Sequence, residues 1–91
     1  MEFIIIDGKR MTSVEETHRY LYRSLHLPPY YGHNLDALHD CLTDLGSDTW
    51  IILINGDILD ENLGKYAGKL RRVFLESCNG PFSCHFVENP S

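Results

Sequence analysis

The sequence predicts an α/β domain built on a three-stranded parallel sheet with helical crossovers. Three short apolar segments, 2–6, 49–54 and 82–87, have the composition of strands. Amphipathic helical patterns separate the first segment from the second and the second from the third. Strands separated by helices pair in parallel, and the most evenly apolar segment, 49–54, is expected in the centre. We expect a single domain over residues 1–91, which is long enough for one core.

The N-terminal part predicts a strand followed by a helix. The segment EFIII at 2–6 is β-branched and aromatic, and an Asp-Gly turn signal closes it. The segment SVEE at 13–16 forms a capping box, in which Ser13 accepts from the backbone N–H of Glu16. The helical stripe that follows ends before Pro28, because the residue ahead of a proline disfavours helix.

A second helix is predicted to begin after Asn34, which is a good N-cap, and to end near Gly46. Its apolar side chains repeat at helical spacing and are expected to face the core: Leu35, Leu38, Cys41, Leu42 and Leu45. The segment TWIILI at 49–54 is apolar without alternation. This pattern is typical of a strand covered on both faces.

The C-terminal part predicts one long helix and a final strand. Residues 57–62 indicate only a short helical turn, and an amphipathic stripe then runs from Leu63 to Cys78. The segment at 82–87 alternates like an edge strand, with three side chains expected on one face: Phe82, Cys84 and Phe86. Residues 88–91 are expected to fray.

Composition limits the possible partners. The formal net charge of -5 disfavours binding to nucleic acid and favours a basic protein partner. The apolar runs are too short to cross a membrane, and the N-terminus lacks a signal-peptide pattern, so we expect a cytoplasmic protein. Three cysteines without a C-x-x-C motif, Cys41, Cys78 and Cys84, predict reduced thiols. No cofactor is expected.

Several acidic residues lie where they do not help a helix. Asp36, Asp40 and Asp44 recur at one-turn spacing, and like charges so placed repel by a few tenths of a kcal/mol per pair. Asp44 and Glu76 both fall near helix C-termini, where the helix dipole opposes a negative charge. Such a row is either a solvated acidic face or a surface for a cationic partner.

The segment LPPYYGHNLDALHDCL at 27–42 is similar to the signature segment of the barstar family, the intracellular inhibitors of secreted bacterial ribonucleases such as barnase. The segment VFLES at 73–77 resembles the family's last-helix segment. The resemblance implies that the three strands run in sequential order. It also implies inhibition of a small basic ribonuclease in a one-to-one complex, with Asp40 in the place of a substrate phosphate.

The resemblance further implies a contact surface around Asp40, formed by Tyr30, Gly32, Asn34, Leu35, Asp36, Thr43 and Glu76. His39 joins this surface at a position where the best-known member has Trp, and it could pair with Asp36 at mildly acid pH. Asp44 and Leu45 replace a Gly-Trp pair at the rim. These differences favour a related ribonuclease over barnase itself.

Three alternatives remain open. His33, Asp36, His39 and Asp40 lie within two turns, but their spacing is not that of the i, i+4 histidine pair of a zinc protease, and no metal is expected. The same residues could supply an acid–base pair, but there is no nucleophile motif, and no enzyme is expected. The serious alternative is an interaction module of the same fold that binds a different basic protein or toxin.

Overall fold

The computed structural model describes residues 1–89. The chain forms, in order, β1 (Glu2–Asp7), the 3-10 helix η1 (Gly8–Arg10), α1 (Val14–Ser24), α2 (Leu35–Thr43), β2 (Thr49–Ile54), α3 (Gly56–Leu63), α4 (Lys65–Ser77) and β3 (His85–Glu88).

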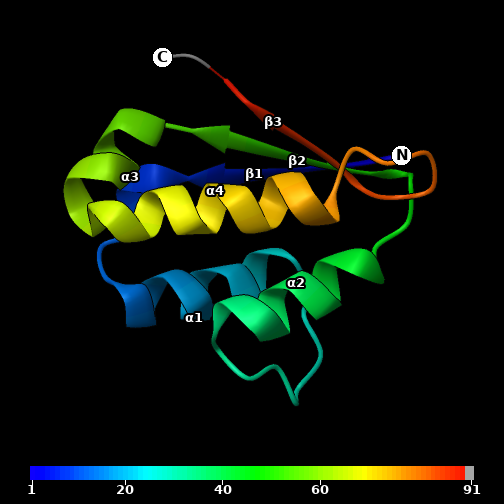
Figure 1. The fold of residues 1–91 in the computed structure, drawn as a ribbon, viewed down its shortest axis with the longest axis horizontal. Coiled ribbons are helices and arrows are strands. Elements are labelled where there is room, and N and C mark those ends of the chain that lie inside the picture. The colour runs from blue at the N-terminus through cyan, green and yellow to red at the C-terminus, as the bar shows by residue number, and fades with distance from the viewer. Residues whose placement is uncertain (90–91) are drawn as a thin grey trace.

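The three strands pair in parallel in the order β1-β2-β3. This confirms the predicted α/β class with β2 in the centre, and the sequential order that the resemblance implies. Figure 1 shows α1, α2 and α4 on the same side of the sheet. The register aligns Ile4, Ile51 and Phe86 in one row, and all three side chains face the helices.

In residues 1–89 helices cover one face of the sheet and leave the other open. Along β2, Ile51 and Leu53 are buried while Trp50 and Ile52 are half-buried. On the uncovered face of β1, Phe3 is 60% exposed. The prediction that β2 is covered on both faces is therefore wrong. Its even apolarity reflects side-by-side contacts on the open face, where the Trp50 ring stacks on His85 with centroids 4.2 Å apart.

Three boundaries differ from the predictions, and the first difference follows from backbone conformation. Asn55 and Gly64 have φ values of 54° and 58°, and these left-handed residues bound a complete helix α3 where only a turn was expected. The last strand begins at His85, and Phe82 is 90% exposed instead of facing inward. Helix α2 ends at Thr43 with Asp44 as its C-cap, so the expected cap at Gly46 is not formed.

The core lies between the sheet and the helices. Leu38 and Leu42 of α2 are fully buried, and α2 packs against α4. Phe74 of α4 stacks on Phe86 of β3, with ring centroids 4.7 Å apart. Burial of side chains of this size contributes about 1.5–3 kcal/mol each to folding. The position of α2 on the molecule is therefore fixed by its two buried leucines.

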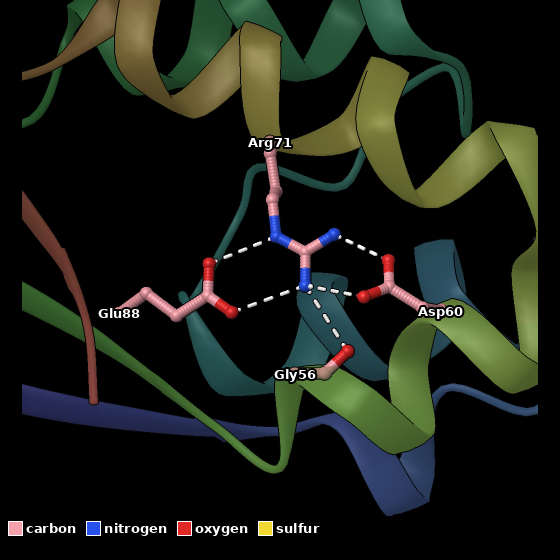
Figure 2. Close-up of polar contacts among 4 residues, drawn as sticks. All are labelled: Gly56, Asp60, Arg71 and Glu88. Atoms are coloured by element: carbon pink, nitrogen blue, oxygen red, sulfur yellow. Dashed lines mark hydrogen bonds and ion pairs between the residues drawn. The ribbon is translucent and has the colours of Figure 1, made fainter. Parts of the chain in front are cut away.

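Arg71 of α4 joins the end of β3 to α3 (Figure 2). Its Nε and Nη2 donate to the Glu88 carboxylate at 2.8 and 3.1 Å, while Nη1 donates to Asp60 at 2.5 Å and Nη2 also to the Gly56 carbonyl at 3.0 Å. The backbone N–H of Asn89 donates to Leu53 at 2.8 Å. Residues 88 and 89 are thus held rather than frayed, and residues 90–91 lie outside the described residues.

Candidate functional site

Helix α2 presents the acidic residues because of how it begins and what it buries. Asn34 is its N-cap, and the side-chain oxygen accepts from the backbone N–H of Ala37 at 2.8 Å. Leu38 and Leu42, four residues apart, turn one side of the helix into the core. Asp36 and Asp40 therefore lie exposed on another side.

The acidic row, defined as Asp36, Asp40 and Asp44, is exposed along its whole length. Within residues 1–89 none of its members takes part in an ion pair. Burial and the charges of Asp44 and Asp40 raise the pKa of Cys41, whose thiol lies between them in sequence. The fold therefore leaves a negative field on this side of α2 without a fixed cation.

The loop before α2 is anchored by one tyrosine and exposes the other. Tyr30 is 82% exposed, whereas Tyr31 is 5% exposed. The Tyr31 hydroxyl contacts Nδ1 of His18 at 2.5 Å, and Nε2 of His18 contacts the Tyr66 hydroxyl at 2.6 Å. This chain of contacts fastens the loop to α1 and α4 at once.

Burial of this Tyr31–His18–Tyr66 triad shifts the pKa of each member. Desolvation raises the pKa values of Tyr31 and Tyr66, because it disfavours the phenolate. Desolvation and, secondarily, His33 lower the pKa of His18, because both disfavour the imidazolium. The three side chains are therefore neutral at neutral pH.

Gly32 and His33 lead the loop into α2. A Cβ on Gly32 would lie 3.2 Å from the side-chain nitrogen of Asn34 and 3.4 Å from the Cβ of Ala37. His33 has a left-handed φ of 55°, and its ring packs on Tyr31 with centroids 5.1 Å apart. The loop therefore folds closely back on the start of the helix.

The remaining predicted site residues lie on α2 and α4. Leu35 and His39 are half-buried, while Thr43 is exposed and its hydroxyl donates to the Asp40 carbonyl at 2.7 Å. Glu76 is exposed in the last turn of α4, and Figure 1 shows the C-terminal ends of α2 and α4 on the same side of the molecule. His39 forms no ion pair with Asp36 in the described part of the chain.

We call the nine predicted positions the candidate face; they are Tyr30, Gly32, Asn34, Leu35, Asp36, His39, Asp40, Thr43 and Glu76. They come from the loop, α2 and α4. Contact between the candidate face and a partner stays a prediction.

The structure of residues 1–89 bears directly on the alternative metal site. Over residues 1–89 no group of three or more His, Cys, Asp or Glu side chains could hold a metal ion, so the four residues of the alternative metal site are not gathered. The surface of residues 1–89 has no pocket. Within the same range, each helix is too short or too polar to cross a membrane.

Sequence reasoning missed the support of the loop. It placed His18 and Tyr66 in apolar helical stripes and gave Tyr31 no supporting contact. The available signal was that each stripe contains a side chain with a polar atom, which needs a hydrogen-bond partner once buried. Neither stripe indicates which partner that is.

Comparison with known proteins identifies the family of the chain. Residues 1–81 match the family model described as Barstar (barnase inhibitor). The chain is 40% identical over 78 residues to the Bacillus subtilis (strain 168) protein named "Putative ribonuclease inhibitor YrdF", an alignment that covers 85% of this chain and 86% of that protein. The chain therefore belongs to the barstar family.

Proposed function

We propose that this protein inhibits a small basic ribonuclease of the barnase type by occupying its substrate cleft in a one-to-one complex. Membership of the barstar family and the name of the Bacillus subtilis relative support ribonuclease inhibition in general. The exposed acidic row is the observation that carries the finer proposal. Within residues 1–89 no cationic side chain of the protein forms an ion pair with it.

The proposed mechanism is occupation of the cleft without catalysis. The Asp40 carboxylate takes the place of a substrate phosphate and accepts hydrogen bonds from cationic side chains of the ribonuclease. Hydrogen bonds between ionised groups are about twice as strong as neutral ones, and a guanidinium adds bidentate geometry. Repulsion within the acidic row is relieved when the cationic cleft closes over it.

The loop before α2 is proposed to supply shape and apolar area. Tyr30 offers an exposed ring, which provides contact area at low cost in side-chain entropy. Because Tyr31 is anchored on His18, the loop is ordered before it binds, and less entropy is lost on association.

Specificity is proposed to come from His39, Asp44 and Leu45. His39 is half-buried between the two acids Asp36 and Asp40 in sequence, and Leu45 is half-buried beyond the end of α2. These positions lie on or beside the candidate face and differ from the best-known family member. A cognate ribonuclease other than barnase is therefore the expected target.

The test is a titration of RNA cleavage by a small basic ribonuclease of the barnase type with this protein. Activity is expected to fall linearly to zero at one equivalent. The Asp40→Ala variant should lose inhibition, whereas Glu61→Ala, which removes the same charge from α3, should retain it.

Cleavage that persists at micromolar inhibitor would contradict the proposal for this ribonuclease class. Binding of a basic protein without nuclease activity, abolished by Asp40→Ala, would instead identify an interaction module of the barstar fold. Inhibition that survives Asp40→Ala would remove Asp40 from the proposed mechanism.

A further inference from the structure

Two of the three cysteines face each other at the turn between α4 and β3. Cys78 follows directly after α4, and Cys84 directly precedes β3. Their Sγ atoms lie 2.7 Å apart, compared with about 2.05 Å in a disulfide bond. Both thiols are in the reduced state, with Cys78 6% exposed and Cys84 fully buried.

Hydrogen bonds of the turn hold this pair in place. The backbone N–H of Asn79 donates to the Cys84 carbonyl at 2.7 Å. The Asn79 side chain accepts from the backbone N–H of Phe86 at 3.0 Å and donates to its carbonyl at 3.2 Å. The backbone on either side of the turn is therefore fixed, and the two sulfur atoms stay opposite each other.

We propose that Cys78 and Cys84 form a site of reversible thiol–disulfide exchange with low-molecular-weight disulfides such as oxidised glutathione. The Cys78 thiolate attacks one sulfur of the reagent, whose S–S bond breaks and releases one thiol. The Cys84 thiolate then attacks Cys78 in the mixed disulfide and releases the second thiol. The protein dithiol is oxidised to an internal disulfide, and the reagent is reduced to two thiols.

The structure favours the internal step over a stable mixed disulfide. Cys84 is already within bonding reach of Cys78, and such proximity gives a high effective concentration. The first step is slower than for an exposed cysteine, because the hydrogen bond with Cys84 and burial raise the pKa of Cys78 and leave little thiolate.

The disulfide would fasten β3 to α4 without displacing α2. The Cys84 thiol now donates to the Leu42 carbonyl at 3.6 Å, and oxidation removes this weak donor. The same carbonyl keeps the backbone N–H of Leu45 as a donor at 3.1 Å. Glu76, the member of the candidate face on α4, lies two residues before Cys78. Because α2 is not displaced, the candidate face should bind its partner equally well in both redox states.

The test is incubation of the folded full-length protein with oxidised glutathione, followed by unfolding, alkylation of the remaining thiols and peptide mapping. We expect a cross-linked peptide joining Cys78 to Cys84, two hydrogen atoms lighter than the reduced form, while Cys41 is alkylated or carries glutathione. The oxidised protein should unfold at a Tm higher by on the order of 10 °C, and dithiothreitol should reverse the shift.

The matched control is Cys84→Ser, which keeps Cys78 and should stop at the glutathione adduct. Full alkylation of both Cys78 and Cys84 after prolonged incubation, or a stable glutathione adduct on Cys78 in the unchanged chain, would overturn the proposal. Because peptide mapping of the unchanged chain gives the decisive result, the test does not depend on whether the variant folds.

Discussion

Asp40 has an acidic neighbour one helical turn before it and another one turn after it. Asp36, Asp40 and Asp44 are exposed, and within residues 1–89 none of them has an ion-pair partner. The orientation of α2 is fixed by its buried leucines instead. The fold thus gains nothing from the Asp40 charge, so loss of this charge should affect binding rather than stability.

The first prediction concerns Asp40→Ala. The free energy of unfolding should stay the same or rise by a few tenths of a kcal/mol, because repulsion from two neighbours is removed. Affinity for the cognate ribonuclease should fall by about 2–5 kcal/mol, the range for truncating one partner of a buried charge pair, for which the barnase–barstar complex is itself a reference case. Urea unfolding and titration calorimetry measure the two quantities.

Glu61→Ala is the matched control, since it removes an exposed acid of α3. It should leave both quantities close to those of the unchanged protein. A marked loss of stability in Asp40→Ala, absent from the control, would show that Asp40 supports the fold, and the proposed role would then fail.

His18 carries the second prediction. Burial, followed by the charge of His33, lowers the pKa of His18 below its ordinary 6.5. Between the lowered pKa and 6.5 the unfolded chain binds a proton that the folded chain does not, so stability falls as the pH drops through this window. The free energy of urea unfolding should therefore be lower at about pH 5.5 than at about pH 7.5.

The control for this prediction is His26→Asn. His26 is exposed and has a left-handed φ of 54°, a conformation that Asn tolerates. This variant should keep the pH dependence, whereas replacing His18 by Gln should remove it. Equal unfolding free energies at both pH values would contradict the assignment.

The residues of the candidate site were predictable to different degrees. Helical periodicity was sufficient to expect the acidic row on one side of α2, and it lies there, exposed. Periodicity could not separate Tyr30 from Tyr31, because the difference arises from His18, 13 positions away in the chain. Long-range contacts of single polar atoms leave no periodic trace in a sequence.

At the scale of elements, strong patterns predicted well and special backbone conformations did not. The bounds of β2 and the N-cap of α2 agree with the predictions, because a continuous apolar run and an Asn cap are local signals. Helix α3 was missed because Asn55 begins it in a left-handed conformation without a side-chain cap. The alternating pattern at 82–87 wrongly predicted that Phe82 faces inward. The turn closed by the hydrogen bond from the Asn79 N–H to the Cys84 carbonyl holds Phe82 outside the sheet.

The third prediction concerns the attachment of β3. Arg71→Lys keeps the charge but loses the planar fork that binds Glu88, Asp60 and the Gly56 carbonyl together. Because the carboxylates are partly exposed, solvent screening limits the loss to about 1–2 kcal/mol of unfolding free energy. Chemical denaturation measures it, and hydrogen exchange should show faster opening of β3.

Arg72→Lys is the neighbouring control. Arg72 is exposed and forms no ion pair within residues 1–89, so its replacement should change the unfolding free energy by less than about 0.5 kcal/mol. Equal effects of the two substitutions would mean that the fork geometry of Arg71 contributes nothing to the attachment of β3.

The whole molecule has a formal net charge of -5, and its charges are unevenly used. Arg19 and Arg71 are paired with acids of their own fold, whereas the acidic row on α2 remains without such a partner in the described part of the chain. The acidic row therefore adds an uncompensated negative field on the side where the proposed partner would bind. A basic ribonuclease should be drawn to this side before contact is made.

The fourth prediction follows from this field. The association rate constant with the cognate ribonuclease should fall at least ~10-fold when the ionic strength rises from about 0.02 M to about 0.5 M, because the Debye length shortens below the size of the acidic row. The dissociation rate should change much less, since bound charges are shielded from salt. Stopped-flow fluorescence at several salt concentrations separates the two rates.

Asp44→Asn should reduce the salt dependence more than Glu61→Gln, which changes the same charge on α3. An association rate that does not respond to salt, or equal slopes for the two variants, would exclude steering by α2 and leave short-range complementarity as the source of affinity.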